Sequence, residues 1–147
     1  MLDEKTYSAF DHLGWRLWRA ARMWKAEFER RMAERGFSWY SEGRSALLAH
    51  IGDMGIRQST LVRRMGLSKQ AVQQLVDELA AEDAIARRTD PADTRGRIIT
   101  RTAKGAAAAR ASNEVKREID NIQRHQLGAA RFEALTAALR AIAPDAE

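Results

Sequence analysis

Residues 57–105 show helical patterns followed by strand patterns, and this order limits the fold more than any other feature of the chain. Two helical patterns are separated by Gly66, and they are followed by two strand patterns that flank a turn at Pro91. Two helices that cross steeply need a connecting residue that adopts a left-handed backbone conformation, and glycine does so without steric cost. The order therefore predicts two crossed helices, over about residues 59–65 and 68–83, followed by a β-hairpin.

The second of these helices has one apolar face and one polar face. The apolar residues recur at the spacing of a helix face that packs inside a domain: Ala71, Val72, Leu75, Val76, Leu79 and Ala80. The opposite face carries Ser68, Lys69, Gln70, Gln73, Gln74 and Asp77. Glutamine can pair with adenine through two hydrogen bonds in the major groove of DNA, and lysine can reach guanine or a phosphate. An ordinary solvated helix also carries Lys and Gln, but the glycine turn and the local charge favour a helix that reads DNA.

The hairpin is expected to end in a basic tip. Between its two strand patterns lies the segment Asp-Pro-Ala-Asp-Thr-Arg-Gly-Arg. Gly96 relieves the turn, and Arg95 and Arg97 project from it, which suits the negative potential of a narrow minor groove. Asp93 is expected to support the tip by holding the Arg95 side chain through a charge-assisted hydrogen bond. Alone, this would be an ordinary charged hairpin; directly after two crossed helices, it indicates a wing.

The positive charge of the chain is concentrated in the same segment. From Arg57 to Lys104 there are ten Lys and Arg against six Asp and Glu, so this third of the chain holds four of its five net positive charges. A basic surplus confined to one motif is typical of a surface that binds phosphates. Arg87 and Arg88 alternate across the first strand, so at least one of them is expected to face phosphate. Ser59, at the start of the first crossed helix, completes the candidate DNA-binding set.

Amphipathic helical patterns flank this segment on both sides. One ends near Gly36, and two follow Thr102, the last of them ending before Pro144. Their apolar faces are larger than a small winged domain needs, so we expect them to pack against a second copy of the chain. The expected fold is mainly α with a small β-hairpin, and the expected organisation is a single domain over residues 1–147, with a winged helix-turn-helix part at 41–105, hairpin strands at 84–89 and 97–102, and dimerisation helices at 1–35 and 106–143.

Three segments resemble the MarR family of bacterial winged helix-turn-helix transcriptional regulators. Asp90-Pro91-Ala92-Asp93-Thr94-Arg95 matches the family's D-P-x-D-x-R wing, and Leu61-Val62 with Gly66-Leu67-Ser68 is similar to its helix-turn-helix signature. Thr102-Ala103-Lys104-Gly105 resembles the end of its L-T-x-x-G segment, although Arg101 stands where the family usually has leucine. Because the flanking helices also occur in the family's order, the resemblance covers nearly the whole chain.

The resemblance implies a homodimer that binds double-stranded DNA at a pseudo-palindromic operator, with one recognition helix on each half-site. It also implies a repressor that is released by a small aromatic or phenolic effector, bound between the dimerisation and DNA-binding parts. Trp15, Trp18 and Trp39 are the candidate residues of such a ligand pocket. Aromatic residues at helical spacing are more often core or interface residues, so both roles stay open.

Other classes of function find little support in the sequence. The chain has no cysteine, and His12, His50 and His125 fall on different expected helices without metal-ligand spacing, so we expect no metal and no cofactor. No nucleophile–base motif or phosphate-binding glycine loop is present, which argues against an enzyme. No apolar stretch approaches the ~20 residues of a membrane span, and the first residues lack an apolar signal segment, so we expect a cytoplasmic protein.

Two alternative functions remain. A non-specific architectural DNA-binding protein would share the basic wing, but it would not need Gln70, Gln73 and Gln74 on the second helix. A protein-interaction module with a winged fold would not need Arg95 and Arg97. The sequence leaves the operator, the effector and the direction of regulation open.

Overall fold

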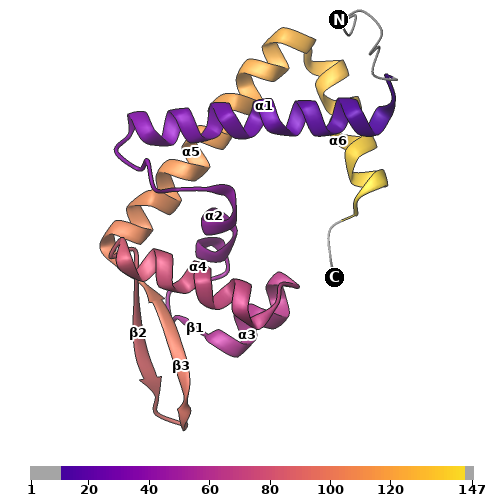
Figure 1. Cartoon of the computed structure of the whole chain (residues 1–147). Helices are drawn as coiled ribbons and strands as arrows, with labels where there is room; N and C mark the ends of the chain where they lie inside the picture. The colour runs from indigo at the N-terminus through magenta and orange to yellow at the C-terminus, as the bar shows by residue number, and fades with distance from the viewer. Residues whose placement is uncertain (1–10, 145–147) are drawn as a thin grey trace, which may run out of the picture.

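The computed structural model describes residues 11–144, without the side chain of Glu42. Helices and strands follow one another in the order α1 (Leu13–Glu34), α2 (Glu42–Ala49), β1 (Ile56–Arg57), α3 (Gln58–Met65), α4 (Lys69–Ala81), β2 (Ile85–Asp90), β3 (Asp93–Arg101), α5 (Ala103–Leu127) and α6 (Ala129–Ile142) (Figure 1). The fold is mainly α with a small sheet, as the sequence predicts. The expected first dimerisation helix, residues 1–35, falls partly on residues 1–10, which lie outside the described residues.

The crossed helices α3 and α4 meet at the turn that the sequence predicts, for local chemical reasons. α3 ends at Gly66, whose backbone is left-handed with a φ of 62°. The Ser68 side chain caps α4 by accepting a hydrogen bond from the backbone N–H of Ala71 at 3.1 Å. Val76 and Leu79 are buried on the inner face of α4, which confirms the predicted division of that helix.

The sheet contains a strand that the sequence does not predict. Its strand order is β1-β3-β2 with both pairs antiparallel, and Ile56 of β1 faces Ile99 of β3. β1 has two residues, too few to show an alternating pattern in the sequence. The hairpin is also tighter than predicted, because β3 begins at Asp93 instead of Arg97 and pairs there with Asp90. β1 thus ties the hairpin to the start of α3.

Ion pairs hold α1 against α5. Arg31 of α1 and Arg35, which caps the C-terminal end of α1, contact the Glu118 carboxylate of α5 at 3.1 and 2.5 Å, respectively. The hydrogen bond from Arg35 is the largest cause of the lowered pKa of Glu118. On α1 itself, Glu27 accepts hydrogen bonds from Arg30 and Arg31, and these lower its pKa to about 2. Both carboxylates are therefore ionised at neutral pH, and the Glu118 contacts that join α5 to α1 keep their charge.

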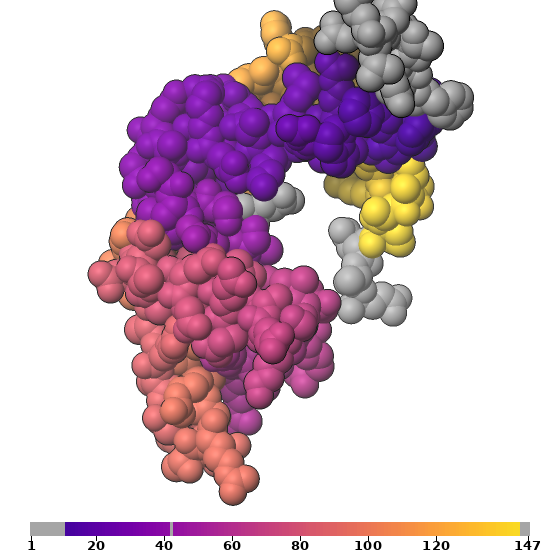
Figure 2. Space-filling view, viewed as in Figure 1, coloured from indigo at the N-terminus to yellow at the C-terminus, as the bar shows by residue number. Residues whose placement is uncertain are grey.

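The helices form an arch rather than a closed body. α1 crosses α5, and the lobe of α2, α3, α4 and the hairpin lies below one end of α1. α6 passes behind the other end of α1 and continues below it (Figure 1). Figure 2 shows the open space between α6 and this lobe. The apolar core runs from the C-terminal half of α1 through the lobe to α5, and its fully buried side chains include Phe28, Leu48, Val76, Ile99 and Val115.

Large apolar side chains stay exposed on α1, α5 and α6. Leu135 and Ile142 of α6 are 45% and 59% exposed, and Met23 of α1 is 65% exposed. The other exposed residues of this kind on these helices are Leu13, Trp15, Trp18, Ile122, Leu127 and Leu139. Apolar surface gathered on a few elements is typical of a contact surface. None of the helices within residues 11–144 is long and apolar enough to cross a membrane.

Candidate nucleic-acid interface

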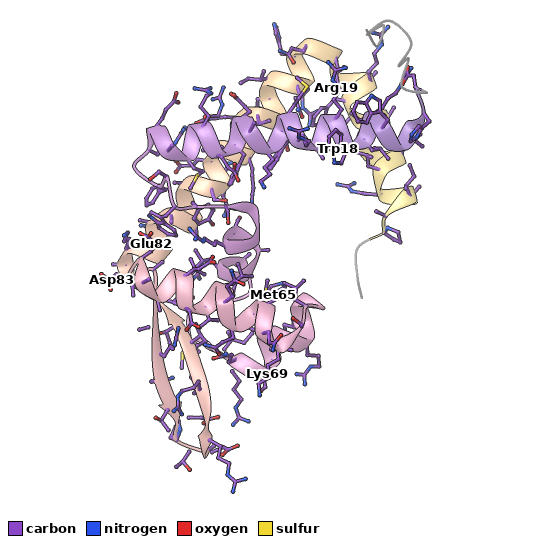
Figure 3. The ribbon with its side chains drawn as sticks, in the orientation of Figure 1. Trp18, Arg19, Met65, Lys69, Glu82 and Asp83 are labelled. Carbon is purple, nitrogen blue, oxygen red and sulfur yellow. The ribbon has the colours of Figure 1, made fainter. Side chains whose placement is uncertain are left out.

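The polar face of α4 is open to solvent on the side of the molecule from which the hairpin extends. Ser68, Lys69, Gln70 and Gln74 are exposed, and Gln73 is half-buried. Lys69 stands at the N-terminal end of α4, on the edge that is turned away from α1 (Figure 3). The structure thus places all the residues that were predicted to contact DNA from this helix on one surface.

A groove of about 530 Å³ lies between α3, α4 and the hairpin. Its lining brings together residues of the predicted set from all three: Ser59, Lys69, Gln73, Asp93, Arg95, Gly96 and Arg97. Arg57, Gln58 and Asp90 also line it. Asp90 belongs to the wing motif, whereas nothing in the sequence indicated a role for Arg57 or Gln58. A second groove, of about 440 Å³, follows α4 and is lined by Lys69, Gln70, Gln73, Gln74, Asp77 and Glu78. Lys69 and Gln73 line both grooves and therefore lie at the centre of the surface.

Asp93 supports the hairpin tip in a different way from the one predicted. Its carboxylate accepts a hydrogen bond from the backbone N–H of Arg95 at 3.0 Å, and not from the guanidinium. A short Asp side chain readily reaches the backbone two residues onward, which forms an Asx turn. The Arg97 guanidinium folds back and donates to the carbonyl oxygen of Gly96 at 3.2 Å. Local contacts therefore shape the tip, and the Arg95 side chain stays exposed.

Asp90 is the buried anchor of the wing. It is 3% exposed, accepts a hydrogen bond from the backbone N–H of Ala92 at 2.9 Å, and lies 2.7 Å from Nε of Arg57. The contact with Arg57 is a close ion pair rather than a well-aligned hydrogen bond. A buried carboxylate needs such a partner, because burial of an unpaired charge is costly. The wing motif in the sequence pointed to Asp90, but nothing in the sequence linked it to Arg57.

Arg87 and Arg88 have different surroundings. Arg87 contacts Asp77 of α4, which lies on the same polar face as Gln73. A hydrogen bond from Gln73, followed by the one from Arg87, lowers the pKa of Asp77, so this carboxylate is ionised at neutral pH. Arg88 is exposed, and strand alternation turns it to the opposite face of β2. Of the two arginines, at least one of which was predicted to face phosphate, Arg87 is therefore held by α4.

The tryptophans predicted for a ligand pocket do not come together. Trp15 and Trp18 stack on each other, with ring centres 4.9 Å apart, near the exposed N-terminal end of α1 (Figure 3). Trp39 lies in the connection between α1 and α2, with its ring 5.5 Å from that of Tyr40. The reason is the length of α1, since ten residues of helix separate Trp18 from the buried Phe28 by about 15 Å.

A small cavity lies instead between α1, α2 and α5. Its volume is about 170 Å³, and its lining consists of Trp24, Phe28, Ser45, Ala46, Ala49 and Lys116. The ammonium group of Lys116 donates a hydrogen bond to Oγ of Ser45 at 3.2 Å and lies 5.8 Å from the centre of the Phe28 ring. Aromatic walls with one cationic group are the chemistry that a small aromatic anion requires.

The three histidines lie in separate parts of the structure. His12 caps α1 by accepting a hydrogen bond from the backbone N–H of Trp15 at 3.3 Å, His50 follows α2, and His125 is in the last turn of α5. In the part of the chain that the structure describes, no three or more His, Asp or Glu side chains are grouped in a way that could hold a metal ion.

A family model described as MarR family matches residues 43–96, which run from α2 through the crossed helices to the tip of the hairpin. The winged helix-turn-helix segment of the chain therefore matches the MarR family. The matched segment contains the polar face of α4 and the residues that line the groove beside the hairpin, except Arg97. No curated protein matches the chain in sequence.

Solved structures share the fold of this chain over most of its length. A probable transcriptional regulator from Pseudomonas aeruginosa has a TM-score of 0.74 and 24% identity, with 90% of this chain and 97% of the other covered. MepR from S. aureus, solved as a DNA complex, has a TM-score of 0.74 and 17% identity, with 90% and 96% covered. A mutant MarR from E. coli, solved with operator DNA, has a TM-score of 0.74 and 18% identity, with 90% and 94% covered. The shared fold is a winged helix between long flanking helices.

Proposed function

We propose that this protein is a sequence-specific DNA-binding transcriptional regulator. The observation that carries the proposal is the surface on which α3, α4 and the hairpin meet, because it combines neutral amides suited to bases with exposed arginines suited to phosphates. Gln70 and Gln74 are exposed on α4, and Arg95 is exposed at the hairpin tip. A purely electrostatic surface would not require exposed glutamines at its centre. The two structures described above as DNA complexes, of MepR and MarR, share this fold, which supports the proposal.

In this proposal, α4 enters the major groove and the hairpin reaches the adjacent minor groove. An α-helix fits the width of the major groove, where amide side chains distinguish base pairs by their donor and acceptor pattern. Arginine is favoured over lysine in a narrow minor groove, because its guanidinium is planar and more weakly hydrated. Asp93 and Asp90 then act indirectly, by fixing the hairpin tip that presents Arg95.

The proposed functional unit is a homodimer built from α1, α5 and α6. The exposed apolar side chains of these helices and the open space beside α6 (Figure 2) are what a second copy would cover. Two recognition helices related by a two-fold axis would read two half-sites of a pseudo-palindromic operator.

We further propose a repressor that is released by a small aromatic anion bound in the cavity beside Lys116. The volume of about 170 Å³ suits one aromatic ring. Ser45 of α2 lines the cavity, and Arg44, the residue before it, contacts Glu78 of α4 at 3.0 Å. A ligand that moves α2 would therefore act on α4 through this ion pair. The location differs from the predicted tryptophan pocket, because Trp24 and Phe28 supply the aromatic walls.

The test of base reading uses Gln70→Ala and Gln74→Ala, with Lys69→Ala as the comparison. Each glutamine variant is expected to bind the operator about 1–3 kcal/mol more weakly and random DNA almost as well as the parent, because an amide contact to a base is lost. Lys69→Ala is expected to weaken binding to every sequence and to reduce the salt dependence by about one charge. Binding titrations over a salt series measure both effects. Equal loss on operator and random DNA in the glutamine variants would favour an architectural DNA-binding protein instead.

The test of the effector cavity uses Lys116→Met, which removes the charge and keeps an apolar side chain of similar length. Benzoate is expected to bind the parent and to bind this variant about tenfold more weakly, because a charge-assisted hydrogen bond is lost. Calorimetric titration with benzoate and with neutral benzamide measures the difference. Lys104→Met is the control, since Lys104 lies 5.3 Å from the centre of the Trp39 ring but outside the cavity lining. Equal benzoate affinity in the parent and in Lys116→Met would contradict this placement.

A further inference from the structure

A chain of side-chain hydrogen bonds crosses the DNA-facing surface from α3 to the hairpin. The amide nitrogen of Gln58, the first residue of α3, donates to the amide oxygen of Gln73 on α4. The amide nitrogen of Gln73 donates to a carboxylate oxygen of Asp77 at 3.0 Å. The guanidinium of Arg87 on β2 donates to the same oxygen of Asp77. Gln73 is thus held at both ends of its amide.

This arrangement fixes the orientation of the Gln73 side-chain amide. An ionised carboxylate only accepts hydrogen bonds, so Asp77 selects the nitrogen end of the amide, and Arg87 keeps Asp77 ionised. Gln58 donates to the oxygen end. Each end of the amide keeps capacity for one more hydrogen bond, because the nitrogen has a second hydrogen and the oxygen has a second lone pair. One free donor beside one free acceptor is the pattern that pairs with N7 and the N6 amino group of adenine.

The position of Asp77 favours a role in base selection over a role in DNA affinity. Its side chain is 54% exposed on the face that carries Lys69 and Gln70, where a carboxylate would repel DNA phosphates. It also withdraws the charge of Arg87 from those phosphates. A residue that lowers the affinity for every DNA sequence can still serve recognition if it increases the difference in affinity between the operator and other sequences.

We propose that Asp77 and Gln58 are specificity-determining residues that act through Gln73, by fixing the orientation of its amide so that Gln73 reads adenine on one strand of each half-site. Both are positioning residues, since the base contact belongs to Gln73. The inference rests on the proposed function as a sequence-specific DNA-binding protein.

The same helix supplies a matched control. The amide nitrogen of Gln74 donates to Glu78 at 3.0 Å, and Glu78 is held by Arg44 at 3.1 Å. Among the described side chains, no hydrogen bond to the oxygen end of the Gln74 amide is present. Glu78→Gln therefore removes one negative charge beside a recognition-helix glutamine, as Asp77→Asn does, but it leaves Gln73 untouched.

The experiment is a binding selection from a random-sequence DNA pool with the full-length protein, followed by sequencing. The set of proteins is the parent, Gln73→Ala, Asp77→Asn, Gln58→Met and Glu78→Gln. The parent is expected to select adenine at one position of each half-site, and Gln73→Ala to lose that preference. Asp77→Asn and Gln58→Met are expected to lower it about tenfold at the same position, because the amide can then turn over. Glu78→Gln should keep it. Asp77→Asn should also bind random DNA more tightly, because Arg87 is released.

Each outcome bears on a different claim. If the parent selects no sequence, both the proposed function and this inference are wrong. If the parent selects a sequence but the Asp77→Asn profile equals that of the parent, with only a uniform rise in affinity, Asp77 acts through charge alone and the inference is overturned. The same holds if Glu78→Gln lowers the preference at the Gln73 position as much as Asp77→Asn does. Thermal denaturation of each variant separates these outcomes from loss of folding, and Gln58→Met tests the amide orientation without any change in charge.

Discussion

Gly105→Ala is expected to destabilise the protein by about 3 kcal/mol, because the backbone leaves no space for a side chain at this position. A Cβ on Gly105 would lie 1.9 Å from the carbonyl oxygen of Ala84 and 2.9 Å from its carbonyl carbon. Both atoms belong to the backbone that enters β2, and the same oxygen accepts a hydrogen bond from the N–H of Thr102 at 3.1 Å. The start of α5 and the base of the wing must therefore separate if a methyl group is added.

Urea denaturation followed by circular dichroism measures this loss, and the melting temperature should fall by about 10 °C. Gly43→Ala is the control, because a Cβ at that position in α2 would make an ordinary contact of 3.5 Å with Leu75. It should leave stability unchanged or raise it by up to about 1 kcal/mol, since alanine is a better helix former than glycine. Equal stability of the two variants would mean that α5 does not press against Ala84 in solution.

Leu135→Lys combined with Ile142→Lys is expected to convert the proposed dimer into a monomer. These side chains of α6 are already 45% and 59% exposed within one copy, so lysine should leave the fold of the monomer intact. A charged group buried in an interface without a partner opposes association strongly. Loss of the dimer should also lower the operator affinity by more than about tenfold, because a monomer contacts only one half-site.

Sedimentation velocity at micromolar concentration measures the oligomeric state. Met54→Lys is the control, since Met54 is 85% exposed and lies outside α1, α5 and α6. It should keep both the dimer and the operator affinity. A monomeric parent, or a double variant that still sediments as a dimer, would show that α6 is not the interface.

Local chemistry in the sequence determined the crossed helices and the position of the wing. Gly66 and Ser68 act on the backbone within three residues of themselves, so the end of α3 and the start of α4 follow from those residues alone. The apolar face of α4 follows from its periodicity, and Val76 and Leu79 are buried accordingly. The concentration of positive charge and the Asp-Pro turn likewise depend only on residues that are close together in the chain.

Contacts between distant residues were decided by the tertiary structure. β1 is recognisable because Ile56 lies opposite Ile99, and a two-residue strand has no pattern of its own. The sequence suggested that Asp93 would hold the Arg95 guanidinium, whereas the turn brings the Arg95 backbone N–H to it first.

The polar network of the candidate interface has the same origin. Asp77 lies between Gln73, one turn away on its own helix, and Arg87, which belongs to the wing. The sequence could place Gln73 on a helix face, because periodicity fixes the direction of a side chain. It could not state which atoms hold the amide, since Gln58 of α3 holds its oxygen and Arg87 of β2 holds Asp77, and these elements meet only when the chain packs.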